Sequence, residues 1–145
     1  MKSQRIPWPT ALSLALLTAR SRNTMVEHLG IAFTQLDDYF LRGTMPVDAR
    51  SCQPMRLLHG GASVAFAETL ASVGANCIAE PGMAAVGQEI NANHLRPVPE
   101  GETVTGTACM LYAGARSQVW SIEICNSADQ LTCISRITLA LIKQR

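Results

Sequence analysis

The stretch from Leu57 to Ala79, LLHGGASVAFAETLASVGANCIA, decides the fold of this chain. Glu68 is its only formally charged residue, and it is rich in alanine, the residue with the highest helix propensity. The part that follows His-Gly-Gly is long enough for about five helical turns before Pro81-Gly82 ends the helix. The stretch therefore predicts one long, largely apolar helix.

On a helix, this stretch has two different faces. Residues at helical spacing form an apolar stripe, and small residues beside it let neighbouring backbone approach closely. A polar seam lies on roughly the opposite side. We therefore expect a buried helix that carries one carboxylate. The stripe is Phe66, Leu70, Val73 and Cys77, the small residues are Ala65, Ala67, Ala71, Gly74 and Ala75, and the seam is Glu68, Ser72 and Asn76.

Glu68 is a lone carboxylate in apolar surroundings, which is costly unless the group is paired or takes part in chemistry. It is either a structural residue bonded to its neighbours or a general base or nucleophile. His59-Gly60-Gly61 at the helix start favours the second role, because the free N–H groups of a helix N-terminus stabilise developing negative charge. One oxyanion donor of this kind contributes about 3–4 kcal/mol to transition-state stabilisation.

The spacing of these groups predicts a homo-oligomer. Glu68 is eight residues beyond Gly60, or roughly 12 Å along a helix that rises about 1.5 Å per residue. One reacting carbonyl does not easily reach both groups on the same helix. Two antiparallel copies of the helix, side by side, would bring Gly60 of one chain to Glu68 of the other. We therefore expect at least a homodimer with sites at its interface.

Length and composition argue against several classes of protein. The 145 residues fit one domain, and the charged fraction of 16% is well below the usual ~25%, which indicates a surface hidden against a second copy. A net charge of +1 with dispersed basic residues argues against nucleic-acid binding. No uninterrupted apolar run reaches the length of about 20 residues that spans a membrane.

The cysteines and histidines show no metal-site spacing. There is no C-x-x-C, and the three histidines are scattered. We therefore expect a cytoplasmic protein with reduced thiols and no bound metal or other cofactor. The five cysteines are Cys52, Cys77, Cys109, Cys125 and Cys133.

Residues 1–24 form an N-terminal segment ahead of the main domain, which we assign to residues 25–145. Basic residues precede the apolar run at positions 11–17, as in a short signal peptide. However, the run is short, two prolines come before it, and no small-x-small cleavage site precedes Arg20. We therefore expect an N-terminal helix that packs on the sheet.

Six other segments have the alternation or residue content of strands. Hairpin-length turns between the last four predict an antiparallel meander. One apolar helix, after two strands and before four, predicts an α+β fold in which a curved antiparallel sheet wraps around the central helix. The predicted strands span residues 26–36, 39–47, 84–98, 102–111, 116–125 and 131–142.

Several motifs resemble those of the hotdog-fold thioesterases, in particular the bacterial aroyl-CoA branch. That branch contains 1,4-dihydroxy-2-naphthoyl-CoA thioesterases, siderophore-pathway proofreading thioesterases and one type of 4-hydroxybenzoyl-CoA thioesterase. The resemblance covers roughly residues 25–142 and implies a hotdog fold, dimers that pair into tetramers, and hydrolysis of an acyl-CoA thioester. The motifs are Met45-Pro46-Val47-Asp48-x-Arg50, Gln53-Pro54, Leu57-Leu58-His59-Gly60-Gly61-Ala62-Ser63, Ala67-Glu68, Asn91-Ala92-Asn93-His94-x-Arg96 and Gln118-Val119-Trp120.

Carried onto this sequence, the resemblance implies catalytic roles for five residues. Glu68 would attack the thioester carbonyl or activate water, and the Gly60 N–H would be the main oxyanion donor. Gln53 and His59 would polarise and position the thioester, and Ser72 would orient the water or the carboxylate. In that family the Gly60 side and the Glu68 side come from different subunits. From the residues alone, a loop glutamine such as Gln53 is usually only solvated, although its amide could donate to an oxygen.

The resemblance also implies a place for the coenzyme A arm. Gly87, His94, Arg96 and one turn match positions that line its nucleotide end in relatives, and Arg96 and Arg116 have the charge to bind phosphates. The alternatives are two solvated arginines at strand ends and a packed His94. The residues of the turn are Tyr112, Gly114, Ala115 and Arg116.

Two departures from the family pattern concern the substrate. Met55-Arg56 stands where Phe-Gly is usual, which places a cation and a long side chain near the mouth of the pocket. Tyr112 replaces a histidine that is common in relatives, and Ala115 replaces a serine, so the nucleotide contacts differ.

Three functions are compatible with these residues. The first is hydrolysis of an aroyl-CoA, with an aryl group on a carrier protein as the alternative substrate. An acidic carrier protein would need a basic rim, for which Arg56, Arg96 and Arg116 are the candidates. The second is a non-catalytic acyl-CoA-binding module, which would not need a buried base. The third is a dehydratase, which would use a catalytic histidine such as His59.

Overall fold

The alanine-rich stretch forms helix α3, Gly60–Cys77, in the computed structural model, which describes residues 2–144. The helix begins at the two glycines that were predicted to precede it, because the imidazole of His59 caps its first turn. The Nδ1 atom of His59 accepts a hydrogen bond of 2.8 Å from the Gly61 N–H. The helix ends before the Pro81-Gly82 turn, as the sequence predicts.

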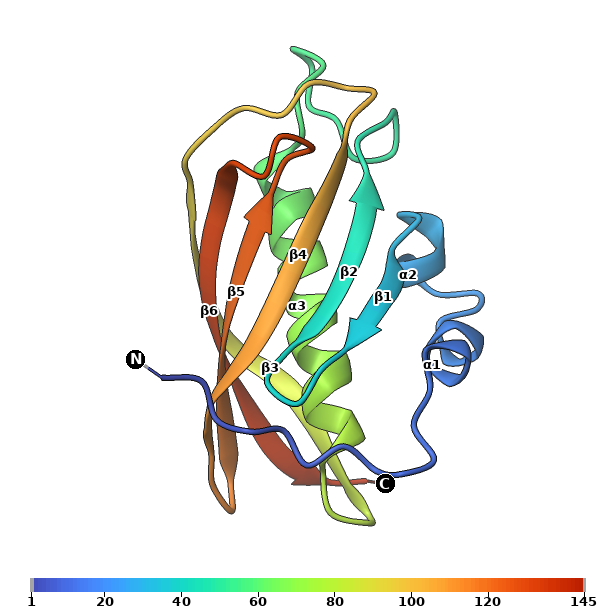
Figure 1. Cartoon of the computed structure of the whole chain (residues 1–145), viewed down its shortest axis with the longest axis vertical. Helices are drawn as coiled ribbons and strands as arrows, with labels where there is room; N and C mark the ends of the chain where they lie inside the picture. The colour runs from blue at the N-terminus through green and yellow to red at the C-terminus, as the bar shows by residue number, and fades with distance from the viewer. Residues whose placement is uncertain (1, 145) are drawn as a thin grey trace.

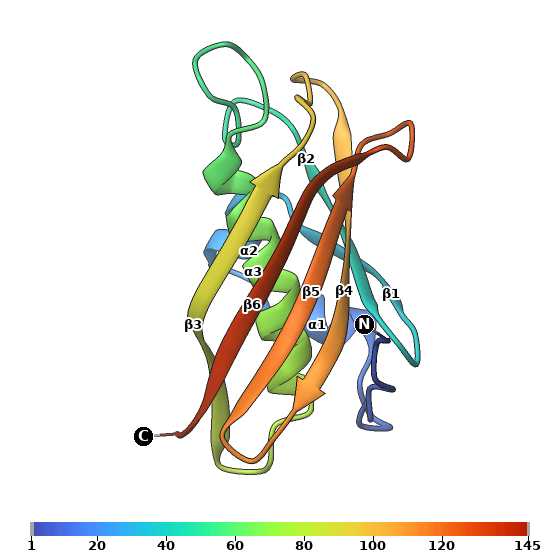
Figure 2. The ribbon, with the colours of Figure 1, turned by 90° about the vertical axis from the view of Figure 1, so that its left-hand side faces the viewer.

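A six-stranded antiparallel sheet curves around this helix, which confirms the predicted α+β hotdog arrangement (Figures 1 and 2). The order of the strands is β1-β2-β4-β5-β6-β3. Strands β1 and β3 are therefore the two edges, and α3 lies along one face. The strands are β1 Ala32–Leu36, β2 Leu41–Pro46, β3 Met83–His94, β4 Thr103–Ala113, β5 Ser117–Cys125 and β6 Leu131–Lys143.

The predicted meander of the last four strands is wrong for β3. Strands β4, β5 and β6 are consecutive neighbours, but β3 pairs with β6 at the far side of the sheet. The reason is that residues 95–102 do not form a hairpin: they cross the end of the sheet near the start of α3. An isolated bridge between Leu57 and Pro99 and a hydrogen bond of 2.8 Å from Leu58 N to Val98 O hold this crossing in place.

The predicted strand at residues 26–36 is also wrong in its first half. There the chain forms the short helix α2, Met25–His28, because the Thr24 hydroxyl oxygen accepts a hydrogen bond from the Val26 N–H at 3.2 Å. The chain then turns at Gly30, whose φ of +69° is accessible to glycine at little cost. Strand β1 begins only after this turn.

The N-terminal segment lies across one end of the sheet and contains helix α1, Leu14–Arg20 (Figure 1). Its backbone is tied to the sheet by a 2.7 Å hydrogen bond from Gln4 N to Met110 O. Ile6 and Leu17 are buried in the common core. Within residues 2–144, none of the helices has the length and apolar character needed to cross a membrane.

An ion pair between Arg50 and Asp48 fixes the loop that leads from β2 toward α3. The Arg50 guanidinium donates hydrogen bonds to the Asp48 carboxylate and, at 2.6 Å, to the His28 carbonyl at the end of α2. The hydrogen bonds from Arg50 lower the pKa of the Asp48 carboxyl from 3.8 to about 2. The Asp-x-Arg part of the sequence motif therefore has a structural role, since it holds this loop in place.

Small residues let α3 lie directly on the sheet. A Cβ added to Gly74 would lie 2.7 Å from Cη2 of Trp120, and one added to Gly106 on β4 would lie 2.6 Å from Cδ1 of Leu70. The buried face is therefore built mainly from small residues, and Val73 and Cys77 of the predicted stripe are only half-buried. The buried residues of α3 are Ser63, Phe66, Ala67, Leu70, Ala71, Gly74 and Ala75.

Gly74→Ala tests this close contact. Alanine gains up to about 1 kcal/mol in helix propensity, but its methyl group overlaps the Trp120 ring. We expect a net loss of about 1–3 kcal/mol in the free energy of unfolding, measured by urea denaturation. In a Trp120→Phe background the outer ring atoms are gone, so the same substitution should cost less. An equal cost in both backgrounds would contradict this packing.

Candidate active site

The first turn of α3 presents one free backbone donor. The His59 carbonyl accepts hydrogen bonds from the Ala62 and Ser63 N–H groups at 2.9 and 3.1 Å, and the His59 ring accepts one from Gly61. This leaves the Gly60 N–H without a hydrogen-bond partner among the described residues. A helix N-terminus with one unpaired donor is suited to a negatively charged oxygen.

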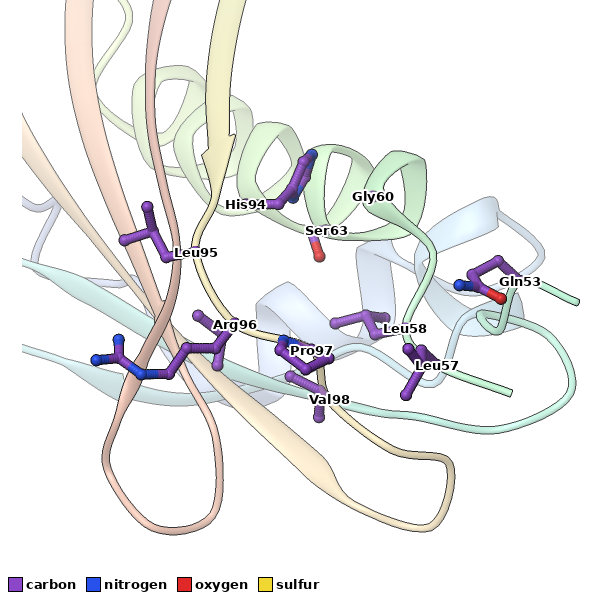
Figure 3. A pocket seen from close by; sticks show the side chains of 11 residues that line it. Gln53, Leu57, Leu58, Gly60, Ser63, His94, Leu95, Arg96, Pro97 and Val98 are labelled. Atoms are coloured by element: carbon purple, nitrogen blue, oxygen red, sulfur yellow. The ribbon is translucent and has the colours of Figure 1, made fainter. Parts of the chain in front are cut away.

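This donor opens on a cavity of about 330 Å³ at the end of the sheet (Figure 3). Its walls come from the loop before α3, the first turn of α3, and the crossing after β3. The walls are mostly apolar, with a few polar groups that converge on the space. The lining residues are Gln53, Leu57, Leu58, Gly60, Ser63, His94, Leu95, Arg96, Pro97, Val98 and Thr132.

Gln53 presents its amide NH2 group on the same cavity. Its side-chain oxygen accepts a hydrogen bond from the Met55 N–H, and its backbone N–H donates to Leu57 O at 2.8 Å. The oxygen is therefore occupied, and the NH2 group has no partner within the described part of the chain. Gln53 is thus held as a donor that faces the cavity, as a role in binding a carbonyl oxygen would need.

His59 shapes the site from the helix cap. Its Nδ1 atom accepts from Gly61, so a neutral ring carries its proton on Nε2. Its backbone N–H donates to Ser51 O at 2.8 Å, which fixes the chain direction at the helix start. The ring is solvent-exposed in the single chain.

His94 lies against Gly60. A Cβ added to Gly60 would come within 2.8 Å of Nε2 of His94, so only glycine leaves room for this ring. The side chain therefore forms one wall of the space around the Gly60 donor (Figure 3). The structure places His94 beside the expected oxyanion donor, away from the turn with which the resemblance groups it.

Glu68 projects from α3 two turns later and meets β3. Its carboxylate lies against the Cα of Gly87, so any larger residue at Gly87 would collide with it. A cavity of about 130 Å³ opens beside it, lined by Glu68, Gly87, Gln88, Glu89, Ile90 and Ile137. Contrary to the prediction, Glu68 is only half-buried, because β3 is an open edge of the sheet at this point.

Glu68 makes no hydrogen bond or ion pair with any residue between 2 and 144. A structural role through such bonds is therefore not supported. Ser72, one turn later, is also half-buried, and no hydrogen bond joins it to Glu68 in the described structure. The predicted role of Ser72 stays a prediction.

The two halves of the predicted catalytic set are separate in one chain. Gly60, Gln53 and His94 line one cavity, and Glu68 lines another that shares no residue with it. Gly60 and Glu68 are roughly 12 Å apart along the helix, which agrees with the spacing argument. A single chain does not bring both groups to one carbonyl.

The residues assigned to the coenzyme A arm are also divided. The guanidinium of Arg96 donates to Leu131 O at 2.6 Å and points away from Gly60 (Figure 3). Gly87 gives room to the Glu68 carboxylate. The turn between β4 and β5 lies at the other end of α3, where Gly114 and Ala115 line a third cavity with Ile78, Ala79 and Glu80. Tyr112 and Arg116 of that turn are exposed.

Sequence reasoning did not single out Ser63, which lines the cavity three residues after Gly60. Its side chain is only 3% exposed, and its hydroxyl group points from α3 into the cavity (Figure 3). The available signal was its spacing, since residues three apart on a helix are neighbours on one face.

Comparisons with known proteins identify the family. The family model described as "Thioesterase superfamily" matches residues 55–133, more than half of the chain. This chain belongs to the thioesterase superfamily. It is 46% identical to the proofreading thioesterase EntH of Klebsiella pneumoniae over 93% of this chain and 98% of that protein. The chain is thus a thioester hydrolase.

Solved structures of other thioesterases agree with this assignment. A thioesterase of Haemophilus influenzae superposes with a TM-score of 0.89 at 43% identity, covering 94% of each chain. A mutant thioesterase of Pseudomonas aeruginosa gives a TM-score of 0.90 at 38% identity, covering 94% of this chain and 99% of that one.

The structure of this thioesterase also explains its unusual Arg56. The backbone of Arg56 has a φ of +60°, a left-handed conformation that favours glycine, which the resemblance expects here. The guanidinium forms a two-point ion pair with the Glu100 carboxylate, and the Glu100 N–H donates to Arg56 O at 3.0 Å. The predicted cation at the mouth of the pocket is therefore neutralised, and the pair joins two walls of the cavity.

Substitutions at Arg56 test the backbone strain. Arg56→Gly and Arg56→Ala both remove the ion pair, but only alanine keeps the left-handed penalty. Glycine avoids this penalty but loses more chain entropy on folding than alanine does. On balance, we expect the free energy of unfolding from urea denaturation to be about 0.5–1 kcal/mol larger for Arg56→Gly than for Arg56→Ala. Arg20 in α1 is the matched control, and there alanine should be more stable than glycine. The same order at both positions would contradict the argument.

Proposed function

We propose that this thioesterase hydrolyses aroyl-CoA thioesters, with 1,4-dihydroxy-2-naphthoyl-CoA among the candidate substrates, at sites shared between two chains. The observation that carries the proposal is that the two functional groups of α3 face different cavities. Among residues 2–144, the Gly60 N–H has no partner and faces one cavity, and the Glu68 carboxylate has no partner and faces another. A thioester hydrolase needs both groups at one carbonyl.

The open edge of β3 supports a dimer that would complete the site. Strand β3 pairs with β6 on one side only, and Val86, Gly87, Gln88 and Glu89 are exposed. A second copy added antiparallel along this edge would continue the sheet and set the two α3 helices side by side. Pairing of two such dimers into a tetramer rests on the family resemblance alone.

In such a dimer, the thioester carbonyl would lie between the Gly60 N–H and the partner's Glu68. Glu68 would take a proton from water, whose oxygen then attacks the carbonyl carbon, or would itself attack and form an anhydride that water opens. The negative charge that develops on the carbonyl oxygen would be held by the Gly60 N–H and the Gln53 amide. The C–S bond then breaks, and the coenzyme A thiolate leaves and takes up a proton.

The aromatic acyl group and the coenzyme A arm are supported by the sequence motifs rather than by a bound ligand. Arg96 and Arg116 form no ion pair within residues 2–144. The Arg116 guanidinium is therefore available to phosphate oxygens, and that of Arg96 is available through the N–H groups that do not donate to Leu131 O. We further propose that the protein acts in the cytoplasm and needs no cofactor, since coenzyme A would be part of the substrate.

Glu68→Gln tests the role of the carboxylate. The amide keeps the size of the side chain but cannot take a proton or act as a nucleophile. We expect kcat to fall by at least ~10³-fold in a thiol-release assay on benzoyl-CoA and other aroyl-CoA thioesters. Thermal unfolding should change little, since Glu68 has no bonded partner among the described residues. Rates for both proteins that equal the uncatalysed rate would favour the non-catalytic binding module, and equal rates above it would contradict the role of Glu68.

Mixed dimers test the shared site. Gln53→Ala damages the oxyanion side and Glu68→Gln the carboxylate side, so a dimer with one copy of each has one intact site out of two. Co-expression with two different tags allows this dimer to be purified. We expect about half of the wild-type activity per dimer, far above either parent variant. Activity no higher than that of the parents would place both groups of each site on one chain.

An aryl group misloaded on a carrier protein is the second candidate substrate. The likeness to proteins named EntH proofreading thioesterase favours it. The pairing of Arg56 with Glu100 weakens it, because it removes one cation from the basic rim that an acidic carrier would contact. The ratio of kcat/KM for the same aroyl group on the carrier protein and on coenzyme A distinguishes the two substrates.

The two remaining functions are less well supported. A binding module has no use for an unpaired carboxylate beside a substrate cavity. A dehydratase would need a catalytic histidine, but the Nδ1 atom of His59 is engaged in capping α3.

A further inference from the structure

Ser63 is an unusual serine because it is buried and yet makes no hydrogen bond through its side chain. It is 3% exposed, and its hydroxyl group donates to no residue between 2 and 144. Other hydroxyl groups on helices in this chain bond back to the carbonyl four residues earlier: Thr69 to Ala65 O at 2.7 Å and Thr18 to Leu14 O at 3.0 Å. Ser63 does not bond in this way to His59 O.

The free hydroxyl group of Ser63 belongs to the cavity. No side-chain oxygen or nitrogen that is sealed from solvent lacks a partner in the described structure. The Ser63 oxygen is therefore accessible, and the accessible space beside it is the cavity that Gly60 also lines (Figure 3). Because this hydroxyl group is unpaired among the described residues and reaches the cavity, it is free to donate a hydrogen bond to a ligand atom bound there.

Ser63 and Gly60 lie on the same face of α3, one turn apart. Residues three apart on a helix are about 5–6 Å from each other. Two donors at that separation can converge on one oxygen that lies between them, since each hydrogen bond is about 2.7–3.0 Å long. Leu58 and Val98 add apolar walls beside these two donors.

We propose that the Ser63 hydroxyl group is a third donor to the thioester carbonyl oxygen, acting together with the Gly60 N–H and the Gln53 amide. The inference rests on the proposed function, because it places the reacting carbonyl in this cavity. Like the Gln53 amide, and unlike the backbone N–H of Gly60, this donor can be removed by mutation.

The test compares Ser63→Ala with the wild-type enzyme. Alanine suits a helix and fills nearly the same volume, so the thermal unfolding midpoint should be retained. We expect kcat/KM for benzoyl-CoA to fall about 10–100-fold. Ser63→Thr keeps the hydroxyl group and should recover most of this loss. Ser135→Ala is the matched control, because Ser135 is 4% exposed and its hydroxyl group donates to Ile122 O at 3.4 Å, away from the cavity.

A binding measurement separates this inference from the proposed function. The probe is an aryl ketone analogue of an aroyl-CoA, in which a methylene group lies between the carbonyl and the sulfur so that nothing can be hydrolysed. Calorimetry should give a dissociation constant about 3–10-fold weaker for Ser63→Ala than for the wild type. Wild-type binding without turnover would overturn the proposed function alone. Unchanged kcat/KM and unchanged ketone affinity in Ser63→Ala would overturn the role of Ser63 alone.

Discussion

The cap that His59 places on helix α3 determines how the rest of the site is arranged. A helix begins with several unpaired N–H groups, and a cap that satisfied all of them would leave nothing for a substrate. Here the ring and the carbonyl of His59 satisfy the N–H groups of Gly61, Ala62 and Ser63, and within residues 2–144 the Gly60 N–H has no partner. The cap therefore stabilises the helix and at the same time selects a single donor. That donor lies where the loop before α3 and the crossing after β3 enclose a cavity.

Four glycines on or near α3 each leave room for a different neighbouring side chain. Gly74 makes room for the Trp120 ring and Gly106 for Leu70, and these contacts hold the helix on the sheet. Gly60 makes room for the His94 ring and Gly87 for the Glu68 carboxylate, and these contacts form the two halves of the site. Fold and function therefore depend on the same close approach between one helix and one sheet. A side chain at any of these positions would shift the helix or displace a functional group.

Local patterns in the sequence were enough to predict helix α3 and most of the strands, because these depend on residues close together in the chain. They also singled out Glu68 and Gly60, whereas the other candidate site residues came from the family resemblance. The alanine-rich stretch and the Pro81-Gly82 stop define α3 almost alone. The place of β3 could not be found in this way, since the sequence suggested a short turn to β4, whereas residues 95–102 cross the end of the sheet. The left-handed backbone of Arg56 was hidden for a similar reason: its support comes from Glu100, which is distant in sequence. Ser63 was overlooked because only the structure distinguishes a free hydroxyl group from one that bonds back to its helix.

The half-burial of Glu68 and the open edge of β3 have one explanation. A carboxylate without a partner is tolerated in a single chain only because it still reaches water, and it does so where β3 has no neighbouring strand. A second chain added along this edge would remove that water and satisfy the free N–H and C=O groups of the strand in the same step. The carboxylate would then lie in a drier space, where its interaction with a reacting water and with an oxyanion donor is stronger. Assembly would thus bring the Gly60 N–H of the second chain to Glu68 and lower the local dielectric constant. Neither the Gly60 cavity nor the Glu68 cavity of one chain could hydrolyse a thioester by itself.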